Sequence, residues 1–143
     1  MKANDLIETA KRAGNFQVFT SALAEAGLEE TLKMMGPYTL FAPTDLAFGR
    51  YPKAEFERLF KSQNKDHLQL MLRTHIVPRK LMMSELTSLD TVVNARGEEL
   101  KIESRLGVWI NEAKILLPDL EASNGVLHGI ESVLTPEAEV ARA

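Results

Sequence analysis

Cysteine is absent from the 143 residues, and its absence excludes several kinds of chemistry at once. Without a thiol the chain has no disulfide, no thiolate zinc site and no cysteine nucleophile. Long apolar runs are also missing: none approaches the roughly 18 residues of a membrane-spanning helix, so we expect no membrane span. Lys and Arg number 17 against 20 Asp and Glu, and they form no basic block. A chain with this net charge of −3 is a poor candidate for binding nucleic acid.

The sequence also lacks a recognisable catalytic or metal-binding motif. Its three histidines, His67, His75 and His128, are far apart and show no paired ligand spacing. The zinc-protease pattern His-Glu-x-x-His, the hydrolase pattern Gly-x-Ser-x-Gly and a phosphate-binding glycine loop do not occur. Most carboxylates fall in helical patterns with Lys or Arg nearby, which is typical of solvated surface charge. We therefore expect a protein that is not an enzyme and that holds no cofactor or metal.

Length and composition favour one globular domain. Apolar residues make up 45% and charged residues 26% of the chain, which suits a single hydrophobic core. Apolar residues at helical spacing, with Asn, Thr, Gly and Pro at the ends, predict helices over 6–13, 16–26, 28–35, 45–48, 53–61 and 65–77. Short β-prone or alternating segments predict strands over 38–42, 91–93, 100–104, 108–110, 114–117 and 126–134. Helices that mostly precede strands indicate an α+β fold.

A few positions are predicted to shape the chain locally. Asn4, Thr44 and Asn64 are good N-caps for the helices that follow them, and Asp45 is favourable in the first turn of the helix after Thr44. Asn124-Gly125 is a tight-turn signal before the last strand. Pro118 is expected to end the strand that precedes it.

His75 occupies an apolar position of its helix, between Leu72 and Ile76. A histidine in that place is expected to be buried and neutral, with a ring nitrogen bonded to a polar partner. Thr44 and Asp45 are the polar groups that we expect near it, so the hypothesis pairs His75 with one of these two residues. A ligating or catalytic role for His75 is the alternative interpretation.

Three segments resemble those of a known family. Residues 36–48, Gly-Pro-Tyr-Thr-Leu-Phe-Ala-Pro-Thr-Asp-Leu-Ala-Phe, are similar to the first signature of fasciclin-like domains, and 122–134, Ala-Ser-Asn-Gly-Val-Leu-His-Gly-Ile-Glu-Ser-Val-Leu, to the second. Residues 72–78 resemble the central Tyr-His segment, and order and spacing agree over 3–136. The resemblance implies one domain over 1–136, and the remaining tail over 137–143, rich in Ala, Glu and Arg, is expected to fray. The resemblance also implies a compact wedge, in which two small packed β-sheets (a β-sandwich) lie against a helical half.

The resemblance further implies a function in cell adhesion or extracellular-matrix interaction, without catalysis. The implied partner is a cell-surface or matrix protein or a glycan. In animal relatives an Asp-Ile pair before the second signature is implicated in integrin binding, and Asp119-Leu120 occupies the matching positions. A second implicated region, the Tyr-His pair with its neighbours, corresponds to Thr74, His75 and Ile76, where Thr74 replaces the aromatic residue. Asp119 is expected to be the more exposed candidate, and the alternative interpretation is that it is a loop acid before a turn with no binding role.

Compartment and oligomeric state are less closely indicated. A single domain without cysteine, N-glycosylation sequon or anchor is more typical of bacterial than of animal members. The resemblance implies export to the periplasm, the cell surface or the medium, with the signal peptide absent from this chain, whereas a native start at Met1 would indicate the cytoplasm. The alternative function is a periplasmic or cytoplasmic small-ligand-binding or scaffold protein that uses the cleft between helices and sheet. The oligomeric state is left open.

Overall fold

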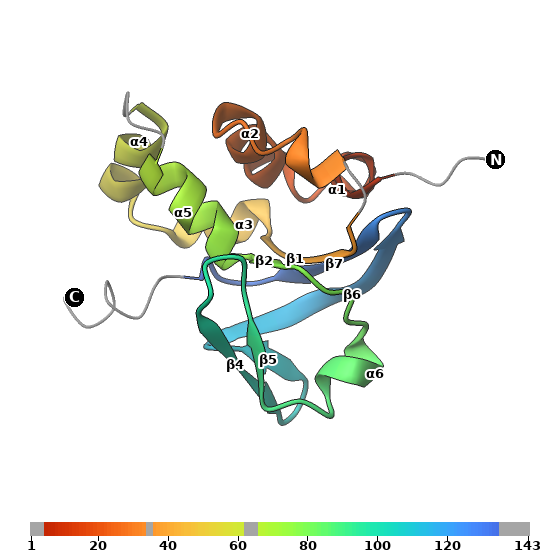
Figure 1. Ribbon diagram of the computed structural model, residues 1–143. Coiled ribbons are helices and arrows are strands. Elements are labelled where there is room, and N and C mark those ends of the chain that lie inside the picture. The colour runs from red at the N-terminus through yellow and green to blue at the C-terminus, as the bar shows by residue number, and fades with distance from the viewer. Residues whose placement is uncertain (1–4, 34–35, 62–65, 135–143) are drawn as a thin grey trace.

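The structure is a computed structural model that describes residues 5–33, 36–61 and 66–134. Helices α1 to α5 gather on one side of the molecule and the strands on the other (Figure 1). The elements in chain order are α1 (Leu6–Ala13), α2 (Gln17–Glu25), the 3₁₀ helix η1 (Thr31–Lys33), β1 (Tyr38–Pro43), α3 (Asp45–Arg50), α4 (Lys53–Lys61), α5 (Asp66–Thr74), β2 (Ile76–Val77), α6 (Met83–Leu86), β3 (Thr91–Val93), β4 (Glu99–Ser104), β5 (Val108–Ile110), β6 (Ala113–Ala122) and β7 (Gly125–Ile130). This mixture confirms the α+β class.

Local capping explains where the first helix begins and ends. The Asp5 side chain accepts a hydrogen bond from the Glu8 N–H at 2.9 Å, which satisfies a free amide in the first turn of α1. Gly14 follows the last residue with a φ of 80°, a conformation that glycine adopts without strain. The predicted cap, Asn4, lies outside the described residues. Asp5 therefore caps the helix one residue later in the chain.

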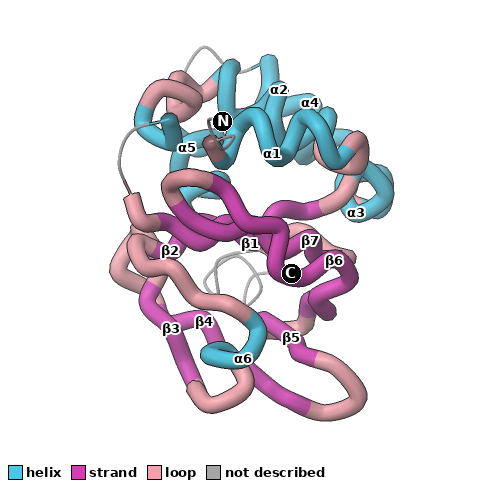
Figure 2. Tube along the Cα trace, turned by 90° about the vertical axis from the view of Figure 1, so that its right-hand side faces the viewer, coloured by secondary structure: helices cyan, strands magenta, loops and turns pink. Residues whose placement is uncertain are grey.

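The seven strands form one sheet in the order β2-β1-β7-β6-β5-β4-β3, which curls until it is nearly a barrel (Figure 2). β1 pairs in parallel with β7, and the other pairs are antiparallel. The two ends of this order meet, because the Ala95 N–H after β3 donates to the Ile76 carbonyl of β2 at 2.7 Å. Two separate packed sheets, and hence a β-sandwich, are not confirmed, since β6 pairs with both β5 and β7 and makes the order continuous.

Two hydrophobic clusters stabilise the fold. The first lies between the helices and the sheet, where Phe16 and Phe19 belong to the same cluster as Leu40 and Leu127. The second fills the inside of the curled sheet and includes Phe41. Leu40 and Phe41 fall into different clusters because neighbouring residues of a strand point to opposite faces. Both faces of β1 and β7 are thus covered, which explains why these strands are nearly continuous buried runs.

One predicted strand boundary was wrong because of the irregular path of β6. Pro118 does not end its strand, and β6 continues to Ala122. The pairing with β7 shifts register between Ile115 and Leu117 and again between Leu117 and Leu120. Proline is tolerated at such a bulge, since its missing N–H does not interrupt a regular ladder there.

Other boundaries differ for simpler reasons. The predicted helix over 65–77 was wrong at its end, because α5 ends at Thr74, His75 lies in a turn and Ile76–Val77 form β2. β2 and α6 have only 2 and 4 residues, too few to show a period of their own. The predicted helix over 28–35 is reduced to η1 in its described part, and the last strand ends at Ile130 instead of Leu134. Asn64, a further predicted cap, lies outside the described residues, as does the tail 137–143.

Candidate functional site

Asp119 lies on the bulged part of β6, where the segment before α6 contacts the sheet. Its φ of 58° is in the left-handed region, which Asp tolerates better than most residues. Its side chain is 39% exposed. Its Oδ1 accepts from the N–H of Met83 at 2.9 Å, and Met83 is the first residue of α6. The carboxylate is therefore accessible to solvent and also held in place by a helix amide.

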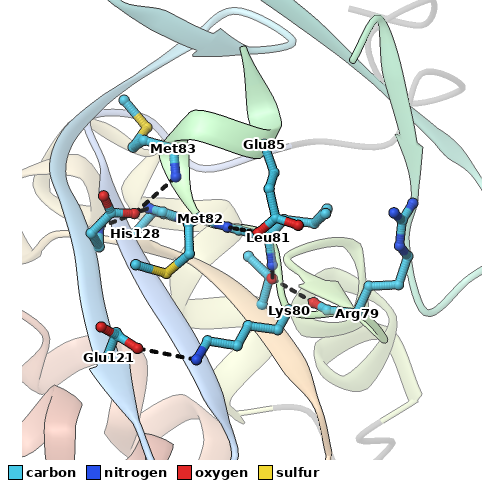
Figure 3. A network of polar contacts seen from close by, with 10 residues as sticks. Arg79, Lys80, Leu81, Met82, Met83, Glu85, Glu121 and His128 are labelled. Atoms are coloured by element: carbon cyan, nitrogen blue, oxygen red, sulfur yellow. Dashed lines mark hydrogen bonds and ion pairs between the residues drawn. The ribbon is translucent and has the colours of Figure 1, made fainter. Parts of the chain in front are cut away.

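The strap, residues 78–82, connects β2 to α6 and contacts three strands on its way. Thr39 of β1 binds it twice, because its Oγ1 donates to the Arg79 carbonyl and accepts from the Leu81 N–H. On β6, Glu121 Oε2 lies 3.0 Å from Lys80 Nζ. Figure 3 shows this network, with Lys80 reaching towards Glu121 and Leu81 near His128. These contacts hold the strap against the sheet.

His128 links the strap to the bulge from inside. Its side chain is fully buried and stacks on Phe41, with ring centroids 5.9 Å apart. Nε2 donates to the Leu81 carbonyl at 2.7 Å, and Nδ1 accepts from the Asp119 N–H at 3.0 Å. A ring that donates from one nitrogen and accepts at the other is neutral. Burial lowers the pKa of His128, and the bond to Leu81 and the charge of Asp119 oppose only part of that effect.

These elements together form a surface that we call the Asp119 corner. It comprises Asp119, Leu120 and Glu121 of β6, Lys80 and Met82 of the strap, and Met83 of α6. Leu120 is half-buried because it packs against the first hydrophobic cluster. The corner thus presents an oriented carboxylate beside an ion pair and adaptable methionines. That combination suits a partner that brings cationic or N–H donors. Within the described ranges, no group of three or more acidic, histidine or cysteine side chains is placed to hold a metal ion.

His75 is buried, as expected, but its predicted partner was wrong. Nδ1 donates to the Met71 carbonyl at 2.8 Å, and Nε2 accepts from the Leu134 N–H at 2.8 Å. Because two backbone groups satisfy the ring, it needs no polar side chain. Thr44 and Asp45 instead accept from backbone amides of α3 and α2. Burial lowers the pKa of His75 to about 4, against the raising effect of the Met71 bond.

The second predicted partner-binding region is covered. Thr74, His75 and Ile76 are 1%, 0% and 5% exposed. A partner that binds the folded surface cannot reach these three side chains, and their binding role stays a prediction. Asp119 and Leu120 are the predicted contacts that a partner is able to touch.

Asn124 and Gly125 join the last strand to the rest of the fold. The Oδ1 of Asn124 accepts from the Leu6 N–H at 3.0 Å, and its Nδ2 donates to the Leu32 carbonyl at 2.7 Å. A Cβ at Gly125 would collide with the carbonyl oxygen of Tyr38 on β1. Only glycine therefore allows β1 and β7 to approach so closely.

The sequence assigned no role to Thr39, Leu81 or His128, although these three residues hold the strap and Asp119 in place beneath the Asp119 corner. For His128 the sequence does hold one indication. His128 shares one face of the predicted last strand with the apolar residues Val126 and Ile130, so burial is expected. A polar side chain among buried neighbours needs a hydrogen-bond partner. No local signal identifies Thr39 and Leu81, because the bonds that involve them join residues 42 and 47 positions apart.

The sequence matches a family profile over nearly the whole described chain. Residues 14–136 match the family described as Fasciclin domain. The chain belongs to the fasciclin domain family. Its fold agrees with this, since it is similar to a FAS1 domain pair from the insect cell adhesion molecule fasciclin I with a TM-score of 0.84. The similarity covers 96% of this chain and 52% of that chain at 16% sequence identity.

Relatives of this fasciclin domain occur in Synechocystis and in animals. Protein sll1483 of Synechocystis is 36% identical over 135 residues, which cover 94% of this chain and 74% of that protein. Uncharacterized protein sll1735 of the same organism is 33% identical over 130 residues, which cover 91% and 96%. Transforming growth factor-beta-induced protein ig-h3 of Sus scrofa is 32% identical over 134 residues, but these cover only 19% of that protein. The animal relative is thus much longer than the region that this chain matches.

The comparisons establish the domain family but do not identify a partner that binds the Asp119 corner. A fasciclin domain pair belongs to a cell adhesion molecule. In the described part of this chain, none of the helices has the length and apolar character needed to cross a bilayer.

Proposed function

We propose that this fasciclin domain is a non-catalytic surface-interaction module, which binds a cell-surface or matrix protein or a glycan through the Asp119 corner. Its similarity to domains of a cell adhesion molecule supports adhesion as the function class. Such a function requires export, to the periplasm, the cell surface or the medium. The two Synechocystis relatives support a bacterial setting.

The observation that carries the proposal is the supported carboxylate of Asp119. Its backbone N–H donates to Nδ1 of His128, and its carboxylate accepts from the N–H of Met83, the first residue of α6. An acid that is already oriented loses little conformational freedom when a partner binds, which favours affinity. Lys80 and Glu121 pair with each other beside it at 3.0 Å, so Lys80 is already engaged with another carboxylate.

The alternative, a small-ligand protein that uses the helix–sheet cleft, has less support. Side chains from both halves pack in that space, among them Phe16, Phe19, Leu40 and Leu127, all fully buried. A ligand would have to displace such side chains, each of which contributes about 1.5–3 kcal/mol by its burial.

The proposal is tested by comparing how strongly the wild type and the Asp119→Asn variant attach to cells. Asn keeps an oxygen that accepts from the Met83 amide and tolerates a left-handed φ, so the substitution removes little besides the charge. Beads coated with each protein are applied to cells of the organism that encodes the chain. We expect attachment to fall about tenfold, because a hydrogen bond to a charged group contributes about 1.5–3 kcal/mol.

Glu112→Gln is the matched control, since Glu112 is an exposed acid in the turn just before the other end of β6. It should attach like the wild type, and both variants should keep the thermal unfolding midpoint of the wild type. Unchanged attachment of folded Asp119→Asn would show that the corner is not the contact surface.

A further inference from the structure

A second surface lies on the β4–β5 hairpin, at the end of the molecule away from α1 to α5 (Figure 1). The hairpin patch comprises Arg105 and Leu106 of the turn, Trp109 of β5, and Lys114 and Leu116 of β6. It shares no residue with the Asp119 corner and goes beyond the function proposed above.

Leu106 is the least expected residue of the patch. The residue is 97% exposed, and its φ is 47°. Leucine is strained in the left-handed region, and Gly or Asn would suit such a turn position better. Packing does not offset that strain, because almost none of the side chain is covered. Folding therefore does not explain a leucine here, whereas a contact outside the molecule would.

Trp109 lies beside two cations on the outer face of the sheet. Its neighbours on β5 are buried, so its own side chain points outwards. The Cζ of Arg105 lies 5.6 Å and the Nζ of Lys114 lies 5.8 Å from the centroid of the indole ring. The indole N–H donates to the Arg105 carbonyl at 3.0 Å, which holds the ring against the turn. Leu116, two residues after Lys114, is 48% exposed.

We propose that the hairpin patch binds the surface of an anionic phospholipid membrane. Tryptophan favours the boundary between water and lipid, and Leu106 would enter the outer part of the acyl region. Arg105 and Lys114 would bind lipid phosphates. Oε2 of Glu103 lies 3.9 Å from Nε of Arg105, so this carboxylate weakens the attraction between Arg105 and the lipid phosphates. With Lys114 and a partly neutralised Arg105, we expect weak binding, with an affinity for anionic membranes about tenfold higher than for neutral ones.

A sugar is the less suitable occupant of this surface. A glycan would use the face of the Trp109 ring, but the cationic groups of Arg105 and Lys114 already lie near that ring. The exposed leucine of the turn also offers nothing to a sugar hydroxyl. The combination of an apolar tip, an indole and cations matches a lipid headgroup region better.

Trp109 itself reports on the patch, because it is the only tryptophan in the chain. The full chain is mixed with phosphatidylcholine vesicles that either contain or lack about one third phosphatidylglycerol. We expect a blue shift of the tryptophan emission and about tenfold stronger partitioning on the anionic vesicles, with both effects reduced by high salt. Equal partitioning onto both kinds of vesicle would overturn the proposal.

Variants separate binding from folding. Leu106→Asn should lower partitioning about tenfold but should keep or raise the thermal unfolding midpoint, because Asn suits the turn. Lys114→Gln should lower the preference for anionic lipid about fivefold. Leu46→Asn is the matched control and should partition like the wild type, since Leu46 is 76% exposed on α3 in the helical half.

Two further outcomes would also overturn the proposal. An equal loss in Leu46→Asn and Leu106→Asn would mean that any exposed leucine has the same effect. An emission shift with heparin but not with vesicles would assign the hairpin patch to an anionic glycan.

Discussion

The backbone N–H of Asp119 donates to Nδ1 of His128 at 3.0 Å, so a fully buried ring fixes the backbone of an exposed acid. The other nitrogen of the same ring donates to the Leu81 carbonyl in the strap. One side chain thus joins the bulge of β6 to the strap. The ring has to stay neutral, because a protonated Nδ1 cannot accept a hydrogen bond.

Replacing His128 with phenylalanine should lower the free energy of unfolding by about 2–4 kcal/mol. Phenylalanine keeps the stacking on Phe41 but leaves the Asp119 N–H and the Leu81 carbonyl without their partner. Urea denaturation measures the loss, and amide hydrogen exchange should become faster at Asp119. The exposed residue His67 supplies the control, since His67→Phe should change stability by less than about 0.5 kcal/mol. A His128→Phe protein as stable as the wild type would mean that the ring contributes packing alone.

Stability should fall as the pH is lowered from about 6.5 to about 4. The unfolded chain takes up a proton at His75 near the ordinary pKa of 6.5, whereas the folded chain does so only near the lowered pKa of about 4. Between these values the unfolded state holds more protons, so acid favours unfolding by about 1.4 kcal/mol per pH unit for this residue. The lowered pKa of His128 acts in the same direction. Urea unfolding midpoints measured across this pH range check the prediction.

A variant at position 75 isolates the contribution of this residue. His75→Gln should be less stable than the wild type at neutral pH but should lose less stability on acidification, because it has no imidazole to protonate. His67→Gln changes an exposed histidine and should follow the wild-type curve. Identical acid sensitivity in the wild type and His75→Gln would contradict the assignment to His75.

Gly125→Ala should destabilise the fold far more than Gly14→Ala. A methyl group at Gly125 collides with the Tyr38 carbonyl, and relief requires the pairing of β1 with β7 to open. At Gly14 nothing lies within 4 Å, so alanine there costs only the strain of the left-handed φ, about 1 kcal/mol. We expect Gly125→Ala to lose at least about 3 kcal/mol in urea denaturation. Similar losses at both positions would mean that the two strands separate easily.

Elements with strong local signals could be predicted from the sequence. The helix Lys53–Lys61 and the strands Thr91–Val93 and Val108–Ile110 have the predicted bounds. Pro118 shows where a local rule fails. Proline ends a strand that pairs regularly, but β6 pairs with β7 on both sides of a register shift and so continues past it. That pairing belongs to the folded chain and has no counterpart in the residues next to Pro118.

The candidate site was predictable only in part. The helical spacing of apolar residues predicted a buried His75, since one stripe of an amphipathic helix faces the core. His75 is indeed buried, but it lies in the turn directly after α5 and not in the helix itself. The spacing could not identify the partner, because the Leu134 amide lies 59 residues away in the chain. Thr44 and Asp45 were chosen as polar groups near the core, but both accept hydrogen bonds from helix amides instead.

By itself the sequence determined the α+β class, the family resemblance and the lack of thiol chemistry, because composition, periodicity and signature segments depend only on the order of residues. The sequence also predicted that Asp119 is exposed, but tertiary structure alone decided that the Met83 amide and the His128 ring hold it in place. Tertiary structure also decided that Thr74 is buried and that Trp109 lies next to Lys114. The physical reason is that these properties depend on which distant segments meet, and the packing of the whole core decides this in a way that no local preference does.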